Sequence, residues 1–541
     1  MTRATTAQIL LLLMLATSAV ACTNLLVTPG ASADGSAFVT YTCDGVFHPH
    51  LRQTIGVDHE PGSMQTVTHW NGEAHAEIPW PARSNTVTSL INEHQVVVAE
   101  TTFDGRPELH NTHEGIHYWG LMNLILQRAS TAREAVDVLT HLIETYGYRS
   151  TGESFSICDP REVWIVEMIG AGADVKGAVW VARKLPDGTI SAHANMARIG
   201  TFPKDDPKNT LYSDNIFDVA EANGWWSPED GPLNFSEVYD PASVQKKRYC
   251  ATRVWSLFRR AAPSQDFDPA FHRGDPDAER YPLWIKPDEK ISLADVMSLM
   301  RDHYEGTDYD MTAGIDAGPF GCPNRWRPMA WEQEGDEYSW ERPISTQQTG
   351  FSFIGQCRAS MPDPVGGCLW YGVDDTATTV WFPLYAGVTD LPPSYTIGSL
   401  GEFSWDSAWW IFNLVANYAS LKYDYMIEDI RLVQSEIEGN FIAMQPAIES
   451  TATQLYKQDP ALAAEFLTTY SMSAGERVTA RWQDLAKTLL TTYNDGYVRD
   501  DGRTTEVGYP EDWRRHVLQI RPEQFRMQQA EGDTTTNVLP Y

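Results

Sequence analysis

Short apolar stretches separated by turn sequences dominate the first four hundred residues, and amphipathic helical patterns follow them. Two turn sequences, residues 159–162 and 186–188, each join the two strands of a predicted antiparallel pair. The predicted strands are residues 22–27, 36–42, 95–102, 154–158, 163–168, 179–184, 189–193, 350–358, 368–374 and 379–384. This pattern indicates antiparallel pairs of strands.

Helical signals occur at three places. Thr131 and Glu134 form a capping box before an apolar pattern with helical spacing, and Gly147 ends that pattern. Residues 292–304 predict a second helix, and residues 405–493 a helical block with breaks at 459–460 and 471–474. Helices interspersed among paired strands, with a helical block last, predict an α+β fold.

The residue composition along the chain divides it into four segments, the second of which contains an irregular stretch. Residues 1–21 are a leader, residues 22–400 the main body, and residues 401–500 a helical region packed on it. Within the body, residues 201–290 are rich in Asp and Pro and predict an irregular excursion over the surface. Residues 501–541 predict a C-terminal loop and tail.

The leader has the three parts of a secretory signal. Arg3 precedes an apolar stretch at residues 9–16, and Ala19 and Ala21 are the small residues that signal peptidase requires. Cleavage after Ala21 makes Cys22 the first residue of an exported protein, secreted or periplasmic.

Three fates of Cys22 follow from this junction. As a terminal residue it combines a thiol with an α-amine of pKa roughly 7.7–8.0, a known arrangement for covalent catalysis. Alternatively it is the acylated cysteine of a surface lipoprotein, although Ala19 stands where such signals usually have Leu or Val. The third fate is an ordinary disulfide.

Composition excludes several classes of function. The 541 residues include 72 acidic and 41 basic side chains, a net charge of −31, which argues against nucleic acid or anionic membranes as partners. After the leader, no apolar run approaches the ~18 residues of a membrane span. Seven cysteines without zinc-binding spacing predict no metal or other cofactor, and their odd number allows one free thiol with up to three bridges.

Five blocks of sequence resemble one known family. They are CTNLLVTPGASADGSAFVTYTCD from Cys22, YRSTGESFSICDPREVWIVEMIG from Tyr148, SAHANMARI from Ser191, AGPFGCPNRWRP from Ala317 and VGGCLWYGVDD from Val365. The chain resembles the C69 (U34) dipeptidases, N-terminal-nucleophile hydrolases related to penicillin V acylase and bile-salt hydrolase. The resemblance implies a four-layer αββα core in residues 22–400 and hydrolysis of dipeptides through a thioester.

The resemblance also implies roles for particular residues. Cys22 is the nucleophile with its own amine as general acid and base, Asp44 orients that amine, and the Asn195 amide holds the oxyanion. The family's arginine three residues before the aspartate is replaced here by Tyr41. His193 is expected to be a hydrogen-bonding core histidine.

Either another arginine then supplies the positive charge near the thiolate, or the terminal ammonium acts alone. Arg358, Arg198 and Arg325 are the candidates, either for that purpose or for binding the carboxylate of the substrate. Glu100 or Glu153 is expected to hold the free amine of a dipeptide.

Two rival functions remain open. The same machinery acts in related enzymes on N-acyl amino acids, bile salts or β-lactam side chains, and a shared fold does not select among substrates. A non-catalytic surface lipoprotein that binds peptides is the other rival.

Overall fold

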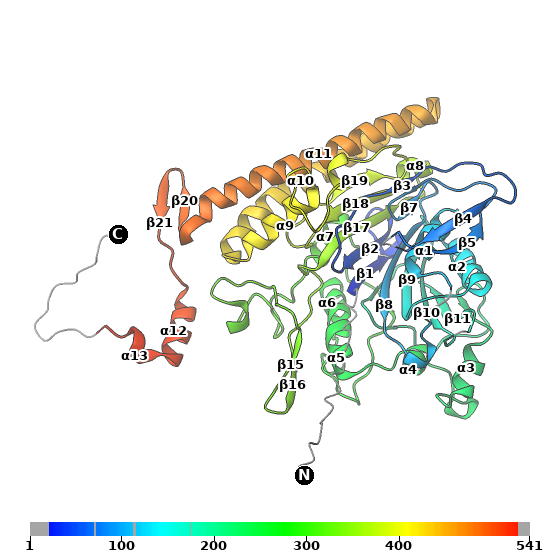
Figure 1. Ribbon diagram of the computed structural model, residues 1–541, viewed down its shortest axis with the longest axis horizontal. Coiled ribbons are helices and arrows are strands. Elements are labelled where there is room, and N and C mark those ends of the chain that lie inside the picture. Colours follow the sequence, from blue (N-terminus) through cyan, green and yellow to red (C-terminus); the bar gives the residue numbers. More distant parts are fainter. Residues whose placement is uncertain (1–20, 70–71, 112–114, 174, 528–541) are drawn as a thin grey trace, which may run out of the picture.

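Two antiparallel sheets form the centre of the protein. The computed structural model describes residues 21–69, 72–111, 115–173 and 175–527, so the predicted signal segment lies outside the described residues apart from Ala21. The seven-stranded sheet has the order β14-β12-β1-β2-β17-β18-β19 (Figure 1). Its strands are β1 (Ala21–Val27), β2 (Ala37–Asp44), β12 (Ile190–His193), β14 (Trp284–Ile285), β17 (Thr349–Cys357), β18 (Cys368–Val373) and β19 (Phe382–Tyr385).

The eight-stranded sheet has the order β13-β11-β10-β9-β8-β7-β6-β3. Its strands are β3 (Gln53–Thr54), β6 (Val87–Thr88), β7 (Ile91–Asn92), β8 (Val97–Phe103), β9 (Gly152–Cys158), β10 (Val163–Gly170), β11 (Ala178–Lys184) and β13 (Thr210–Tyr212). Three separate hairpins are β4 (Met64–Thr68) with β5 (Ala74–Pro79), β15 (Ala330–Gln333) with β16 (Asp336–Ser339), and β20 (Val498–Asp500) with β21 (Arg503–Thr505).

The two sheets pack against each other through β1 and β2 on one side and β8 and β9 on the other. Described side chains of β1 and β2 are buried throughout, as expected for strands covered on both faces. One of the two predicted strand pairs is confirmed: 154–158 with 163–168. The other, 179–184 with 189–193, is wrong. β9 pairs with β10 as predicted, whereas β11 and β12 belong to different sheets.

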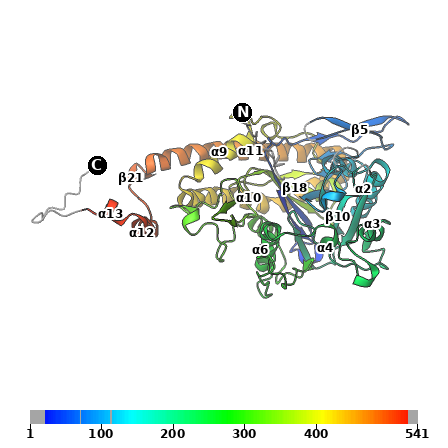
Figure 2. The same ribbon diagram turned by 60° about the horizontal axis from the view of Figure 1, so that its bottom comes forward.

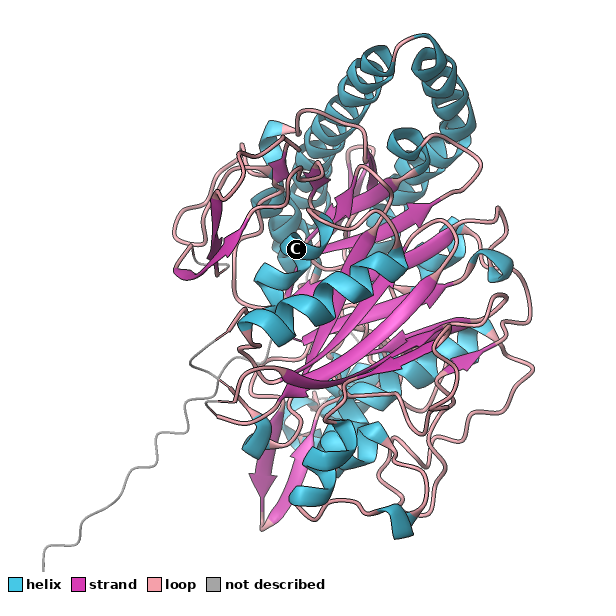
Figure 3. Cartoon of the chain, turned by 90° about the vertical axis from the view of Figure 1, so that its right-hand side faces the viewer, coloured by secondary structure: helices cyan, strands magenta, loops and turns pink. Residues whose placement is uncertain are grey.

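Helices cover the outer face of the eight-stranded sheet. α1 (Tyr118–Leu126) packs on β8, and α2 (Ala132–Tyr146) packs on β9, β10 and β11. The predicted helix is confirmed: the Thr131 side chain accepts from the backbone N–H of Glu134, and Gly147 ends the helix with φ +88°. Only the Thr131 half of the predicted capping box forms, because the Glu134 carboxylate accepts from the Ser130 N–H. Figure 3 shows the strands lying between helices.

The stretch predicted to be a surface excursion contributes to the core. It contains α3 (Ile216–Ala222), α4 (Phe235–Tyr239), α5 (Val244–Lys246), a π-helical turn (Lys247–Ala251) and α6 (Thr252–Ala261), and α7 (Leu293–Leu299) follows. α6 packs on β12 and buries eight of its ten residues. The surface placement was therefore wrong for α6, whose Val254, Leu257 and Phe258 form an apolar face amid Arg and polar residues.

The C-terminal helices pack on the other side of the molecule. α9 (Ala408–Ala419) contacts β18, and α10 (Tyr423–Gln458) and α11 (Pro460–Tyr493) contact β19 and each other (Figures 1 and 2). The helix break at Asp459-Pro460 is confirmed. The break at 471–474 was wrong, because the small Ser471 and Ala474 are fully buried where α11 packs closely on the sheet.

Two further expectations were wrong in detail. The helix predicted over 292–304 ends at Leu299. The predicted C-terminal loop contains α12 (Glu511–Ile520) and α13 (Pro522–Phe525), which lie away from the sheets (Figures 1 and 2). None of the described helices is long and apolar enough to span a bilayer. All seven cysteines are free thiols, so the bridges that the odd count allowed are absent.

Candidate active site

Cys22 is the second residue of β1, in the centre of the seven-stranded sheet. Its register partner on β2 is Cys43, and β12 flanks β1 on the other side. The Cys22 side chain is fully buried. Its backbone nitrogen and its thiol contact different groups, so the two halves of the residue have separate environments.

Asn195 holds the backbone nitrogen of Cys22. It lies two residues beyond the end of β12 and adopts a left-handed conformation with φ +56°, which Asn tolerates better than most residues. Its Oδ1 accepts from the Cys22 nitrogen at 3.1 Å, while its Nδ2 donates to the Thr102 carbonyl at 2.7 Å. The oxygen of Asn195, and not the amide nitrogen expected from the oxyanion role, therefore faces Cys22.

Arg253 on α6 is a site residue that the sequence reasoning missed. Its guanidinium donates to the Cys22 carbonyl at 2.8 Å, to Thr23 Oγ1 at 2.9 Å and to Asn195 Oδ1 at 2.9 Å. It is buried, and burial lowers its pKa. The sequence did contain a signal for this residue. The apolar residues around Arg253 have helical spacing, which predicts a buried helix with a cation on its inner face.

Asp44 ends β2, where it is the register partner of Ala21 and follows the partner of Cys22. Arg342 donates to its carboxylate at 2.9 Å and Thr349 Oγ1 at 2.7 Å. Burial raises the pKa of Asp44, and the charge of Arg342 opposes that rise. Asp44 is thus a buried carboxylate with its own cation, next to the residue before Cys22.

The thiol of Cys22 faces a carboxyl group. Its Sγ lies 3.5 Å from Glu100 Oε1 and 3.9 Å from the Tyr41 hydroxyl, which donates to the same carboxyl oxygen. Tyr41, at the position of the missing arginine, therefore links the nucleophile to Glu100 and brings no positive charge.

Glu153 lies behind Glu100. The Thr102 hydroxyl hydrogen-bonds to both carboxyl groups, at 3.4 Å to Glu100 and 3.2 Å to Glu153. Both acids are fully buried, and burial raises the pKa of each; for Glu153 the Glu100 charge adds to the effect. Two adjacent carboxyl groups in such surroundings favour sharing one proton.

The groups around Cys22 change the pKa of its thiol. Burial raises the pKa of Cys22 well above its ordinary value, and the neighbouring Cys43 thiol and Glu100 carboxyl act in the same direction. A cation near Glu100 would oppose these effects. Burial and both neighbouring groups therefore favour the protonated thiol.

Arg358 and Arg198 are not placed to serve the nucleophile. Arg358 follows the far end of β17 and pairs with Glu449 on α10 at 2.6 Å. Arg198 donates to the Pro282 carbonyl and stacks over Phe258, and burial lowers its pKa to about 9. Both arginines are bound to groups away from Cys22: Arg358 to a carboxylate of α10, and Arg198 to a backbone carbonyl and an aromatic ring.

His193 is the core histidine that the sequence predicted. Its Nδ1 is 2.7 Å from Thr101 Oγ1 and its Nε2 is 2.6 Å from Ser156 Oγ, so it bridges β12 to β8 and β9. Burial lowers its pKa to about 3. It is a neutral link between the sheets.

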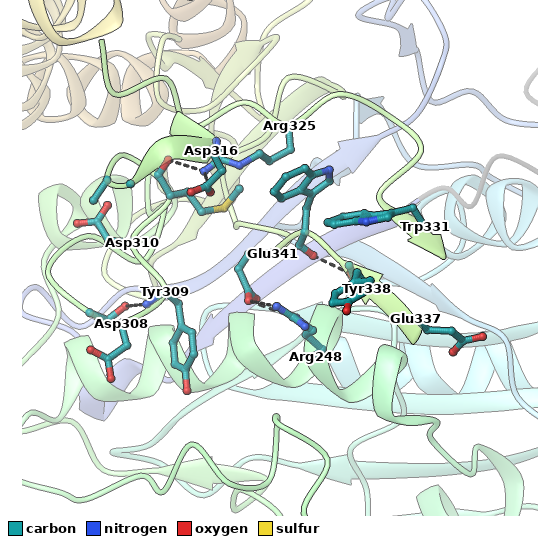
Figure 4. A pocket seen from close by; sticks show the side chains of 16 residues that line it. Arg248, Asp308, Tyr309, Asp310, Asp316, Arg325, Trp331, Glu337, Tyr338 and Glu341 are labelled. Atoms are coloured by element: carbon teal, nitrogen blue, oxygen red, sulfur yellow. Dashed lines mark hydrogen bonds and ion pairs between the residues drawn. The ribbon is translucent and has the colours of Figure 1, made fainter. Parts of the chain in front are cut away.

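A cavity of about 520 Å³ is lined by residues of the 307–316 loop, the β15–β16 hairpin and Arg248 (Figure 4). Glu341, the neighbour of Arg342, lines it and pairs with Arg248 at 2.8 Å, and Arg325 lines it and pairs with Asp316. The Trp331 and Trp340 rings, 4.5 Å apart, form part of the wall. Arg325 is thus a cavity residue whose charge is already paired.

The described residues contain no group of three or more His, Cys, Asp or Glu side chains arranged to hold a metal ion. The chemistry available at Cys22 is that of a thiol, a backbone nitrogen, paired carboxyl groups and buried arginines.

A comparison with known families defines the class of this protein as a peptidase. The model of peptidase family C69 matches residues 21–436, and the chain belongs to that family. The match begins one residue before Cys22 and spans both sheets and the start of the helical block.

Similar proteins carry dipeptidase names. A probable dipeptidase of Salmonella dublin is 27% identical over 410 residues, which cover 71% of this chain and 85% of that protein. Dipeptidase A of Lactobacillus helveticus is 23% identical over 425 residues, covering 74% and 82%. A dipeptidase of Bifidobacterium longum is 24% identical over 439 residues, covering 73% and 76%.

Proposed function

We propose that this protein is an exported cysteine dipeptidase in which Cys22, freed by cleavage after Ala21, is both nucleophile and general acid–base. The observation that carries the proposal is the paired environment of Cys22: Asn195 holds its nitrogen while Glu100 and Tyr41 face its sulfur. Separate contacts to the nitrogen and to the sulfur of Cys22 suit a residue whose thiol is the nucleophile and whose amine is the base.

The proposed cycle starts with transfer of the thiol proton to the neutral α-amine. The thiolate attacks the scissile carbonyl, forming the carbon–sulfur bond. The oxyanion is stabilised by a backbone N–H and by the second hydrogen of Asn195 Nδ2, the one not donated to the Thr102 carbonyl. The ammonium returns its proton to the departing amino acid as the carbon–nitrogen bond breaks. Water activated by the same amine then hydrolyses the thioester.

Asn195, Arg253 and Asp44 position the reacting residue. Asn195 Oδ1 accepts one hydrogen of the amine and so fixes its lone pair, and Arg253 fixes the Cys22 carbonyl and Asn195 together. Asp44 supplies a negative charge that favours the ammonium form. With helices on the outer faces of two packed sheets, the fold we propose is the four-layer αββα core of the N-terminal-nucleophile hydrolases.

The carboxyl pair suits the free amine of a dipeptide. Glu153 Oε1 and the Tyr148 hydroxyl are both fully buried, and neither has a hydrogen-bond partner among the residues that the structure describes, so both can bond to a substrate ammonium. A substrate ammonium bound at Glu100 and Glu153 places the first peptide bond at Cys22. Its positive charge also offsets the two acids and so favours the thiolate.

The decisive experiment compares two forms of the enzyme. One begins at Cys22, and the other retains Ala21, which turns the amine into a non-basic amide. We expect the second form to lose at least about 100-fold in kcat/KM on dipeptides, consistent with loss of general-base catalysis. Equal activity of the two forms contradicts the mechanism, and Cys22→Ala sets the background.

A substrate panel separates the rival function. Dipeptides with a free amine are assayed beside N-acetylated dipeptides, N-acyl amino acids and bile salts. We expect hydrolysis of free dipeptides alone, with KM raised in Glu153→Gln. Preferential hydrolysis of the N-acyl substrates, unaffected by Glu153→Gln, would instead identify an amidase.

Export is tested by the intact mass of the protein from its native host. A mass that corresponds to a bare Cys22 terminus supports the secreted or periplasmic enzyme. A diacyl or triacyl addition at Cys22 supports the lipoprotein.

A further inference from the structure

We propose that Cys22 and Cys43 form a reversible disulfide, so that the nucleophile is a modification site for two-electron oxidants of the hydroperoxide class. The proposal rests on the proposed function only for its activity readout, because the bond itself is detected chemically.

The strand register places the two residues for such a bond. Cys22 and Cys43 are direct partners in the antiparallel pair β1–β2. Directly opposed residues have Cα atoms about 4.5 or 5.5 Å apart, and both values lie within the roughly 4.4–6.8 Å that a disulfide spans. Their side chains also project from the same face of the sheet.

The local contacts leave both sulfurs available to each other. Both are free thiols, Cys22 fully buried and Cys43 4% exposed, and after burial the neighbouring Cys43 is the largest cause of the raised pKa of Cys22. The proposed hydrolysis requires a substrate to reach the Cys22 sulfur, and a hydroperoxide smaller than a dipeptide needs no wider opening.

Other cysteines do not share this position. Cys250 Sγ lies 3.4 Å from the Asn195 carbonyl, on the far side of the residue that holds the Cys22 nitrogen. Cys158 and Cys357 have sulfurs 3.8 Å apart, but β17 pairs with β2 at Cys357–Ala37 there, six residues or about 20 Å from the Phe351–Cys43 pair. Cys43 is therefore the thiol placed to react with an oxidised Cys22.

The chemistry balances in two steps. The Cys22 thiolate attacks a hydroperoxide, a sulfur–oxygen bond forms as the oxygen–oxygen bond breaks, and the alcohol or water leaves with a proton. The Cys43 thiol then attacks the sulfenic sulfur, the disulfide forms, and hydroxide leaves as water with the Cys43 proton. The two sulfurs together lose the two electrons that reduce the peroxide, and two external thiols reverse the change.

This bond would switch the enzyme off and also protect it. A disulfide removes the thiolate and stops hydrolysis, yet a reductant restores it. Without Cys43, the sulfenic acid proceeds to sulfinic acid, which thiols do not reduce.

The test exposes the mature enzyme to a small excess of hydrogen peroxide, followed by peptide mapping and an activity assay before and after dithiothreitol. We expect a Cys22–Cys43 cross-linked peptide, loss of activity and recovery of most of it. In Cys43→Ser we expect the same loss without recovery, with two oxygens added to Cys22. Cys250→Ser is the matched control and should behave like the wild type.

Two outcomes overturn the proposal: wild-type Cys22 found as sulfinic acid beside an unmodified Cys43 thiol, or Cys22 bridged to Cys250. If Cys43→Ser does not fold, Cys43→Ala serves in its place, with circular dichroism to verify the fold. The cross-link remains measurable if the protein cleaves no peptide, so failure of the proposed function is distinguishable from failure of this one.

Discussion

Arg253 and Asn195 converge on Cys22 from two separate elements. The arginine comes from α6 and the asparagine from the turn after β12, and they bond to each other as well as to Cys22. A guanidinium with several donors in one plane fits this task better than the single ammonium of lysine. The position of the nucleophile thus depends on a residue 231 positions away in sequence.

Replacing Arg253 should reduce activity more than stability. In Arg253→Met, the Cys22 carbonyl and Asn195 lose their shared donor, and we expect kcat/KM to fall on the order of 100-fold, as when one preorganised donor is lost. Arg253→Lys should recover part of this loss because the charge remains. Steady-state kinetics on a dipeptide measure the effect, and Arg253→Met with wild-type kcat/KM would contradict it.

At the scale of elements, polar bridges fasten the two sheets together close to the site. His193 on β12 reaches Thr101 on β8 and Ser156 on β9, and Asn24 on β1 also contacts Ser156. Buried polar groups of this kind fix the relative position of two surfaces only when each group is bonded. In a neutral histidine one ring nitrogen donates to one hydroxyl and the other accepts from the second hydroxyl. Protonation makes both nitrogens donors, so the hydroxyl that donated must turn and find another acceptor.

Protonation of His193 should therefore cost stability in acid. Its pKa is about 3 in the fold against roughly 6.5 when unfolded, so the unfolded state binds more protons between these values. The stability it contributes is present above pH 6.5 and declines as the pH falls toward 3, by up to about 1.4 kcal/mol per pH unit.

The measurement is urea denaturation at pH 7, 6, 5 and 4. We expect the free energy of unfolding of His193→Gln to depend less steeply on pH than that of the wild type. His141→Gln, on the exposed face of α2, is the control and should keep the wild-type slope. A wild-type slope in His193→Gln would show that this histidine is not the titrating group.

At the scale of the whole molecule, the C-terminal helices are joined to the sheets by buried ion pairs. Arg358, beyond β17, pairs with Glu449 of α10 at 2.6 Å, and the Tyr385 hydroxyl of β19 donates to the same carboxylate. Arg301 pairs at 2.7 Å with Glu438, which lies about three helical turns before Glu449 on α10. Buried ion pairs as well as apolar packing therefore hold the C-terminal helices against the sheets.

Breaking one partner of the Arg358–Glu449 pair should be costly. Glu449→Ala leaves a buried guanidinium unpaired, and we expect a loss of about 3–5 kcal/mol in the free energy of unfolding. The double variant Arg358→Met with Glu449→Leu should lose less, because no charge is left buried.

Denaturant unfolding of the two variants measures the difference. Glu511→Ala, which breaks the exposed Arg515–Glu511 pair of α12, is the matched control and should have little effect. A Glu449→Ala variant as stable as the wild type would show that the pair does not anchor α10.

The sequence by itself determined the local elements and pointed to Cys22 as the candidate nucleophile. Thr131, Glu134 and Gly147 were sufficient to delimit α2, because capping and termination depend on groups within a few residues of each other. The small residues before Cys22 and the blocks around it likewise singled out the thiol, and they also singled out Asn195.

Only the tertiary structure decided which partners these residues have. Glu100 contacts the Cys22 thiol although the two residues are 78 positions apart, and Arg253, which was not among the three arginines named from sequence, bonds to the Cys22 carbonyl. Arg358 pairs with Glu449 instead. The physical reason is that periodicity reports whether a position is covered, whereas the partner depends on which surface covers it. That choice is made by packing of both sheets and the helices together, and no short stretch of the chain contains it.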